Sequence, residues 1–181
     1  MNALAAAGVV ILFAYLIGAI PFGYLVARWR GIDIFEHGSG NIGATNVGRV
    51  LGRRFGVLVF LLDFGKGAGP VALADWLTRS NPGGWSEALG GGVAAVAAGS
   101  AAFLGHMFPL YLRFRGGKGV ATGAGVVCVL LPGPAAGAVL VWVGVLCATR
   151  FVSVSSLAAA LALCLFRLAL VPSLFRWRIV Y

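Results

Sequence analysis

The sequence predicts an all-α membrane protein, a single bundle of about six transmembrane helices within a range of about five to seven. Hydrophobic residues make up 60% of the 181 positions and charged residues only 10%. The mean hydropathy is +0.97. Long uncharged runs recur along the chain, and basic residues gather between them. Because so little polar surface cannot cover a soluble globule, we expect residues 1–181 to form one integral membrane domain.

The first span is expected at residues 3–27, which contain no charged side chain. A helix of this length reaches about 37 Å, enough to cross a hydrocarbon core of about 30 Å. The alternative is a cleaved signal peptide. No basic residue precedes the run, and the run is longer than the apolar core of a typical signal peptide, so a retained helix is favoured.

Further spans are expected along the rest of the chain. The run 119–149 is too long for one upright helix and contains Pro132, Gly133 and Pro134, so it predicts two short helices joined at the membrane edge. The other apolar segments are 55–78, 88–112 and 151–166.

Basic residues predict the orientation of the bundle. One cluster follows the first span and a second follows residue 112, and the positive-inside bias places both on the cytoplasmic side, with the N-terminus outside. The turn at residues 81–84 is then external, whereas Arg176 and Arg178 would break the rule. The two clusters contain Arg28, Arg30, Arg49, Arg53 and Arg54, and Arg113, Arg115 and Lys118.

The net charge indicates which classes of binding partner suit the chain, and the cysteine positions indicate the role of the three thiols. The net charge of +9 is spread over short loops, which leaves no soluble domain for a nucleic-acid groove, so anionic headgroups or a small anionic substrate fit better. Cys128, Cys147 and Cys164 lie far apart within apolar runs and are expected to be buried small hydrophobic residues. We expect neither a metal nor a soluble cofactor.

The stretch HGSGNIGATNVGR, residues 37–49, is the first candidate site. It nearly matches two soluble nucleotide-binding motifs, but those motifs must follow a β-strand, whereas this stretch follows an apolar helix. Glycines let a backbone approach an anion closely, while neutral donors and an arginine add hydrogen bonds and charge. For the glycines alone, a loop that only packs between helices is an equal alternative. The polar side chains favour an anion site formed by Gly38, Ser39, Gly40, Asn41, Gly43, Thr45, Asn46 and Arg49.

Two further stretches combine glycine with lysine. In DFGKGAG, residues 63–69, Asp63 and Lys66 are three apart on one helix face; we interpret Asp63 as structural and Lys66, with Gly67, as anion-binding. In GHMFPLYLRFRGGKGVATG, residues 105–123, Lys118 precedes the next span, where a helix N-terminus also favours an anion. This segment adds Gly116, Gly117 and Gly119. His106 is open to three roles: base, orienting group or satisfied polar residue at the membrane edge.

Together these stretches resemble the bacterial glycerol-3-phosphate acyltransferases that use acyl phosphate, the PlsY family. The matching segments occur in order: IPFGYLVAR, GSGNIGATNVGR, DFGKG, GHMFPLYLRFRGGKGVATG and TRFVSVSS, from about residue 15 to residue 156. The resemblance implies acyl transfer from acyl phosphate to the 1-hydroxyl of sn-glycerol 3-phosphate, giving lysophosphatidate and phosphate in the first step of phospholipid synthesis. It also implies a multi-pass protein of the bacterial plasma membrane, a cytoplasmic active site, and an upstream enzyme that forms acyl phosphate.

The same resemblance implies catalytic roles for Ser39, Arg49, His106 and Lys118, with the other residues of the three stretches binding substrate. Family members usually end with a further apolar helix and a polar segment that contributes a His and an Asn. This chain ends in LFRWRIVY, so we expect the last span and part of the site to be absent from it. A small-anion transporter is the alternative function, but the sequence has no internal repeat. A purely structural membrane subunit would leave the polar loops unexplained.

Overall fold

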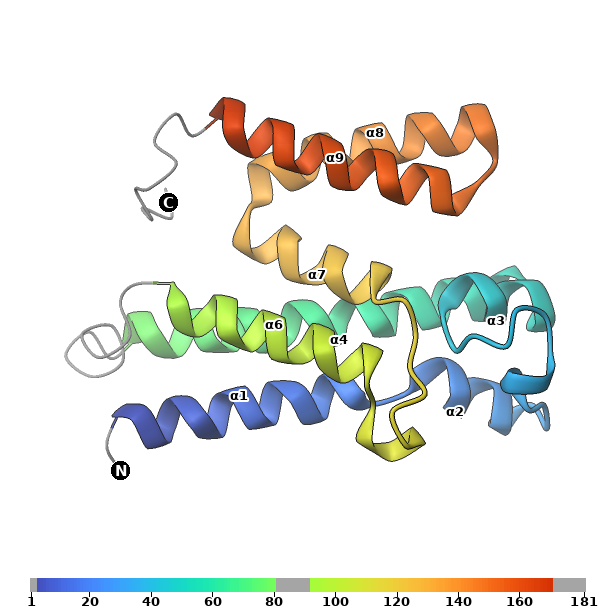
Figure 1. The fold of residues 1–181 in the computed structure, drawn as a ribbon, viewed down its shortest axis with the longest axis horizontal. Coiled ribbons are helices and arrows are strands. Elements are labelled where there is room, and N and C mark those ends of the chain that lie inside the picture. The colour runs from blue at the N-terminus through green and yellow to red at the C-terminus, as the bar shows by residue number, and fades with distance from the viewer. Residues whose placement is uncertain (1–2, 81–91, 171–181) are drawn as a thin grey trace. The chain divides into compact units, whose positions relative to one another are not determined.

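The computed structural model describes residues 3–80 and 92–170, and every regular element in these ranges is helical (Figure 1). The predicted all-α class is confirmed. The elements in chain order are α1 (Ala3–Ala19), α2 (Phe22–Trp29), η1 (Ile34–Glu36), α3 (Ala44–Leu51), α4 (Arg53–Ser80), α6 (Val93–Met107), η2 (Leu110–Leu112), α7 (Val120–Leu130), α8 (Pro132–Thr149) and α9 (Val152–Leu170).

Five helical segments among the described residues are long and apolar enough to cross a membrane. They are Ala7–Trp29, Arg53–Ser80, Val93–Leu112, Pro132–Thr149 and Val152–Leu170. The predicted break in the run 119–149 is confirmed between α7 and α8, where Pro132 begins a new helix. The expectation of two short helices is wrong for α8, which has 18 residues. Of the two helices in this run, α7, with 11 residues or about 16 Å, is too short to span.

The sequence predicted one helix for the first apolar run, but the structure has two, α1 and α2. The run breaks between Ala19 and Phe22, where Pro21 precedes α2. Proline has no N–H to donate and its ring crowds the preceding turn, so it interrupts the backbone ladder. At the break the Ile20 carbonyl accepts two hydrogen bonds, from the Phe22 N–H at 3.1 Å and from the Lys66 side chain at 2.6 Å.

The chain packs as two compact units, and the first spans Met1–Val126. In it α1 and α6 run toward the end where α2 and α3 lie, and α4 runs the opposite way (Figure 1). The contact between α1 and α6 is close because it is made at glycines. A Cβ at Gly18 would overlap Ala102, and a Cβ at Gly105 would overlap Tyr15. Small residues of this kind let membrane helices approach closely.

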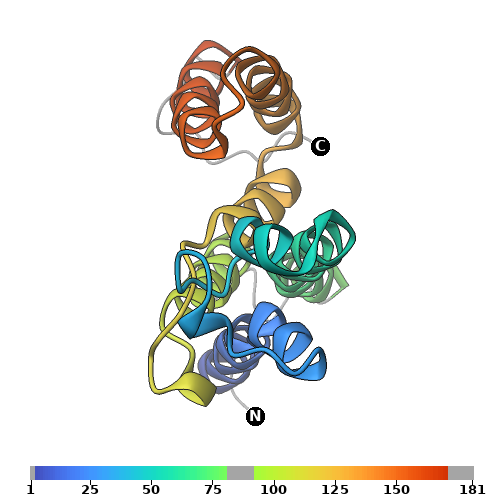
Figure 2. The ribbon, with the colours of Figure 1, turned by 90° about the vertical axis from the view of Figure 1, so that its right-hand side faces the viewer.

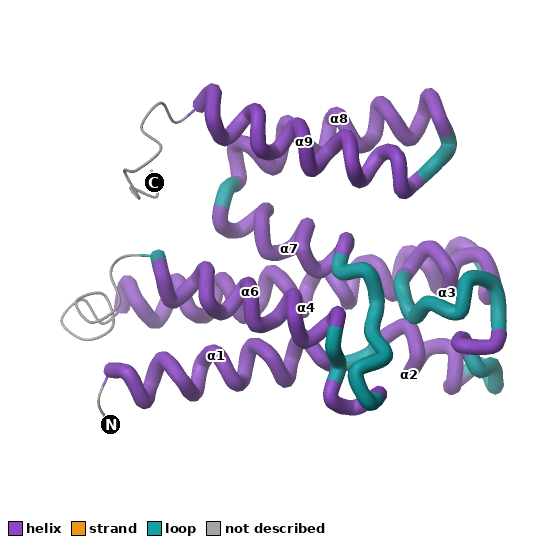
Figure 3. The backbone as a smooth tube through the Cα atoms, viewed as in Figure 1, coloured by secondary structure: helices purple, strands orange, loops and turns teal. Residues whose placement is uncertain are grey.

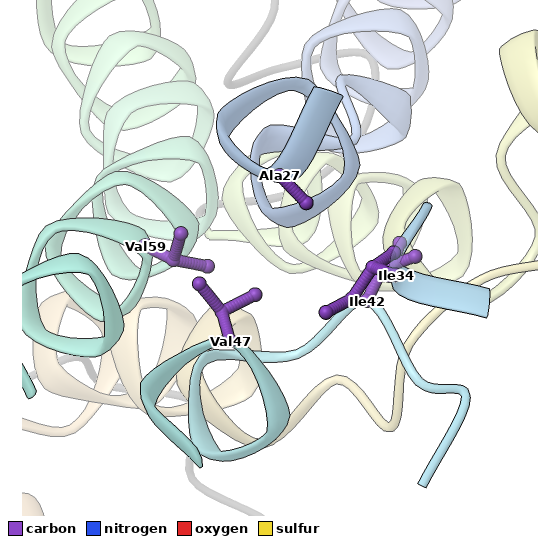
Figure 4. Packing of buried hydrophobic residues seen from close by; sticks show 5 residues of the cluster. All are labelled: Ala27, Ile34, Ile42, Val47 and Val59. Carbon is purple, nitrogen blue, oxygen red and sulfur yellow. The ribbon is translucent and has the colours of Figure 1, made fainter. Parts of the chain in front are cut away.

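A small apolar core lies at the end of this unit where α2, α3 and the start of α4 meet. Its members are Ala27, Ile34, Ile42, Val47 and Val59, whose side chains converge from four segments (Figure 4). Each is at most 1% exposed. Leu112, from the segment after α6, packs against the same cluster. This core therefore joins two loops that are about seventy residues apart in sequence.

The second unit spans Val127–Tyr181 and contains α8 and α9 packed against each other. Trp142 donates its ring N–H to Ser156 at 3.3 Å, and Phe166 fills the space beside Gly137. The expectation of buried cysteines is wrong for Cys147 and Cys164, which are exposed on helix surfaces. The predicted turn at residues 81–84 and the arginines at 176 and 178 lie outside the described residues.

Candidate active site at the loop end of the bundle

The first glycine-rich loop, residues 30–43, is shaped by the side chain of Asn46. The amide nitrogen of Asn46 donates to the carbonyls of His37 and Asn41 at 3.0 and 2.9 Å, and its oxygen accepts the Ser39 N–H at 2.8 Å. Asn46 is only 3% exposed. Because both amide hydrogens are already used, Asn46 fixes the loop and has no donor left for a substrate.

Other polar side chains of this loop and of α3 are exposed. Ser39, Thr45 and Arg49 are exposed, and the last two are four residues apart on α3, so they lie on one face of that helix. Gly38 has φ +62°, and a Cβ on it would overlap the Asn46 oxygen. The Asn41 side chain accepts the Gly43 N–H at 2.9 Å, just before α3 begins. The Asn46 N–H donates to the Gly43 carbonyl at 3.0 Å, so the N–H groups of Ala44 and Thr45 are the ones in this first helical turn that could bind an anion.

The second long loop, residues 108–119, folds back over the end of α6. The Gly117 N–H donates to the His106 carbonyl at 3.1 Å. A Cβ at Gly117 would overlap the His106 ring, and a Cβ at Gly116 would overlap the Met107 carbonyl. The segment lies so close to α6 that only glycine fits at these two positions. Lys118 follows directly and is exposed.

The structure brings the two long loops together, as Figure 2 shows from the loop end and Figure 3 shows in teal. The Arg115 guanidinium lies 4.2 Å from the centre of the Phe35 ring, a cation–π contact between the two loops. The expectation that both basic clusters share one end of the bundle is confirmed by this contact. The sequence analysis counted Arg115 only as a nearby cation, and nothing in the sequence spacing pairs it with Phe35.

A buried polar cluster lies beneath the loops. Lys66 forms an ion pair with Asp63 at 2.9 Å, and His106 Nδ1 lies 3.6 Å from the same carboxylate oxygen. The exposed fractions of the three residues are 2% for Asp63, 4% for Lys66 and 3% for His106. The interpretation of Asp63 as the partner of Lys66 is confirmed.

The predicted site residues therefore fall into two groups. One group lies on the two loops and α3, and all its members are exposed or half-buried except Asn46 and Gly119, which are buried. The other group is buried: Lys66 in its ion pair, His106 beneath Gly117, and Gly67, where a Cβ would overlap the Thr122 carbonyl. These last three were predicted to act on or bind substrate, but their side chains or Cα positions face helix contacts in this arrangement. Within the described ranges no cluster of three or more His, Cys, Asp or Glu could hold a metal.

A helical bundle with several membrane-length apolar helices defines an integral membrane protein, and here two loops rich in glycine and cations meet at one end of it. The comparison with known families identifies the family. The family model described as glycerol-3-phosphate acyltransferase matches residues 8–181. The chain belongs to this family and is an acyltransferase.

Individual relatives agree with the family match. A glycerol-3-phosphate acyltransferase of Myxococcus xanthus is 50% identical over 150 residues, covering 82% of this chain and 73% of the relative. One of Aquifex aeolicus is 43% identical over 156 residues, covering 86% and 76%.

Solved structures of an integral membrane glycerol 3-phosphate acyltransferase, PlsY (YgiH), share the fold at 41% identity. The glycerol 3-phosphate form superposes with a TM-score of 0.80, covering 91% of this chain and 78% of the solved chain. The lysophosphatidic acid form superposes with a TM-score of 0.77, covering 91% and 77%. The predicted family and the multi-pass membrane fold are confirmed.

Proposed function

We propose that this chain transfers an acyl group from acyl phosphate to the 1-hydroxyl of glycerol 3-phosphate on the cytoplasmic face of a bacterial plasma membrane. The hydroxyl oxygen attacks the acyl carbonyl carbon, the bond from that carbon to the phosphate oxygen breaks, and inorganic phosphate leaves. A phosphate oxygen takes the hydroxyl proton. The products are lysophosphatidate and phosphate, and an upstream enzyme forms the acyl phosphate.

The observation that carries the proposal is the meeting of two loops that each combine glycines with a cation. Arg49 follows the first loop on α3, Lys118 ends the second, and Arg115 and Phe35 join the loops at 4.2 Å. Both proposed substrates carry phosphate, so the reaction needs two sets of anion-binding groups at one place. Transfer from a mixed anhydride already has a good leaving group, which suits a site that works by positioning and charge.

We assign the contact with substrate phosphate to exposed groups of the two loops. Arg49 and Lys118 supply charge, Ser39 and Thr45 supply hydroxyl donors, and the backbone N–H groups before α3 and α7 supply further donors. The glycines at these positions allow the backbone to approach an anion: Gly38, Gly40, Gly43, Gly116, Gly117 and Gly119. Asn41 and Asn46 position the first loop. The acyl chain is expected to lie among the apolar helices.

The experiment that tests the donor is acyl transfer by the purified protein in lipid, with acyl phosphate and acyl-CoA compared at equal concentration. Acyl phosphate and glycerol 3-phosphate should give lysophosphatidate without added metal, and inorganic phosphate should compete, because it occupies the same anion-binding groups.

Transfer from acyl-CoA but not from acyl phosphate would contradict the donor assignment. A liposome flux assay runs beside it as a control. Phosphate flux without acyl transfer from either donor would favour an anion transporter instead.

A further inference from the structure

The buried polar cluster lies where α4 and α6 meet. Asp63 and Lys66 come from the middle of α4, and His106 comes from the last turn of α6. One oxygen of Asp63 faces both neighbours, 2.9 Å from Lys66 Nζ and 3.6 Å from His106 Nδ1. Ionisable groups within membrane-spanning helices are costly to bury, so a set of three with shared contacts needs an explanation.

Lys66 connects this cluster to the break between α1 and α2. Its ammonium donates to the Ile20 carbonyl at 2.6 Å and lies 5.5 Å from the centre of the Phe22 ring. An ammonium has three donors, and the carbonyl and the carboxylate occupy two of its directions. The Phe22 N–H also donates to this carbonyl, at 3.1 Å, so Lys66 is its second donor and ties the break before α2 to α4. The first glycine-rich loop follows directly from α2.

His106 connects the same cluster to the second loop. Its ring lies under Gly117, where a Cβ would overlap the ring, and its carbonyl accepts the Gly117 N–H at 3.1 Å. The Nδ1 edge of the ring faces Asp63 on the other side. Both sides of the imidazole are thus enclosed by protein. The residue that follows Gly117 is Lys118.

We propose that Asp63, Lys66 and His106 are positioning residues: they hold the start of α2 and the Gly116–Lys118 segment against one carboxylate, and neither Lys66 nor His106 contacts substrate. This assignment rests on the proposed function for its kinetic consequences. It gives His106 the orienting role among the three that the sequence left open. It also explains why a lysine predicted to bind phosphate is buried in an ion pair.

The decisive variants use the contact between His106 and Gly117. Gly117→Ala places a methyl group against the ring and should lower kcat/KM about tenfold or more, a coupling of the size seen between touching residues. His106→Ala removes the ring and so removes the clash. Adding His106→Ala to Gly117→Ala should therefore raise activity above that of Gly117→Ala alone.

If His106 took part in the reaction, adding His106→Ala to Gly117→Ala would lower the activity instead of raising it. If the imidazole transferred a proton during the reaction, its removal would lower the rate further, by about 100-fold or more, in either background. His106→Asn supplies a second comparison, because it keeps a polar group but cannot act as a base near neutral pH. A positioning role predicts that His106→Asn mainly raises KM for glycerol 3-phosphate, and that its effect disappears when Lys118→Ala is already present.

The thermal midpoint of the purified variants in detergent tests the same contact without any activity. Gly117→Ala should lower the midpoint, and adding His106→Ala should recover part of that loss. Gly133→Ala is a matched control, because no atom lies within 4 Å of a Cβ there. Since this measurement needs no substrate, failure of the proposed function and failure of this inference can be told apart.

Three results would overturn the inference. The first is an activity of the His106→Ala, Gly117→Ala double variant below that of Gly117→Ala, with the thermal midpoint recovered, because the ring then takes part in the reaction. The second is the absence of any recovery in both measurements, because the contact is then absent. The third is a Lys66→Met variant that folds but loses inhibition by inorganic phosphate to the same extent as Lys118→Ala, because Lys66 then binds phosphate directly.

Discussion

The polar residues of the loop end differ in what surrounds them, and this difference decides their roles. Asn46 and Ser39 belong to the same glycine-rich stretch, yet Asn46 is 3% exposed with three hydrogen bonds to the loop, whereas Ser39 is exposed. A buried amide whose bonds are all made stabilises the loop, and its loss leaves backbone groups unsatisfied. An exposed hydroxyl beside a helix N-terminus remains available to a substrate.

Replacing Arg49 or Lys118 with alanine should remove a charge-assisted contact to phosphate. We expect a loss of about 2 to 4 kcal/mol of transition-state stabilisation, or roughly 30- to 1000-fold in kcat/KM. Folding should be retained, because both side chains are exposed. The measurement is steady-state acyl transfer by each variant, with its thermal midpoint recorded beside it. Arg79→Ala, an exposed arginine in the last turn of α4, at the opposite end of that helix from the loops, is the control. Wild-type activity in either variant would remove that residue from the site.

At the scale of elements, the site depends on how closely α1, α4 and α6 approach one another. In lipid, helix association depends on packing at small residues more than on apolar burial, because the lipid tails are as apolar as the side chains. Gly105 is such a residue, since a Cβ there would overlap the backbone of Tyr15 on α1. His106 follows it directly. A displacement of α6 at Gly105 therefore also moves His106, against which the second loop packs.

Gly105→Ala should force α1 and α6 apart and lower the free energy of unfolding by about 1 to 3 kcal/mol, the usual cost of overpacking. Activity should fall as well, because the second loop shifts with the end of α6. Gly8→Ala, on α1, is the matched control, because no atom lies within 4 Å of a Cβ at that position. Thermal and denaturant unfolding in detergent measure the stability. Equal stability of the two variants would mean that α1 and α6 do not meet at Gly105.

At the scale of the whole molecule, the remaining prediction concerns which side of the membrane the loop end faces. The positive-inside bias predicts the cytoplasm. Ser39→Cys and Tyr111→Cys, each in a background without Cys128, Cys147 and Cys164, should resist a membrane-impermeant thiol reagent in intact cells and react in inverted vesicles. Both positions are exposed in the structure.

Ser80→Cys, at the opposite end of α4, supplies the control and should react from outside. Labelling of Ser39→Cys or Tyr111→Cys in intact cells would reverse the orientation.

The sequence alone was sufficient for the class and the candidate loops. Apolar runs long enough to span a bilayer, the helix-breaking residues from 132 to 134, and glycines interleaved with cations are local patterns, and each acts through the few residues around it. The all-α fold, the break before α8 and the Asp63–Lys66 pair were therefore predictable. The break at Pro21 was also within reach, because proline interrupts a helix wherever it lies in an apolar run.

What only the tertiary structure decided is which polar residues are enclosed and which remain open. Lys66 meets a carbonyl 46 residues earlier in the chain, and Arg115 lies on a ring 80 residues away. His106 has Asp63 on one side and Gly117 on the other. These contacts depend on the packing of α1, α4 and α6, which no local spacing encodes. The physical reason is that a glycine, lysine or histidine has the same local sequence signal whether it faces a ligand or a neighbouring helix, and only burial distinguishes the two.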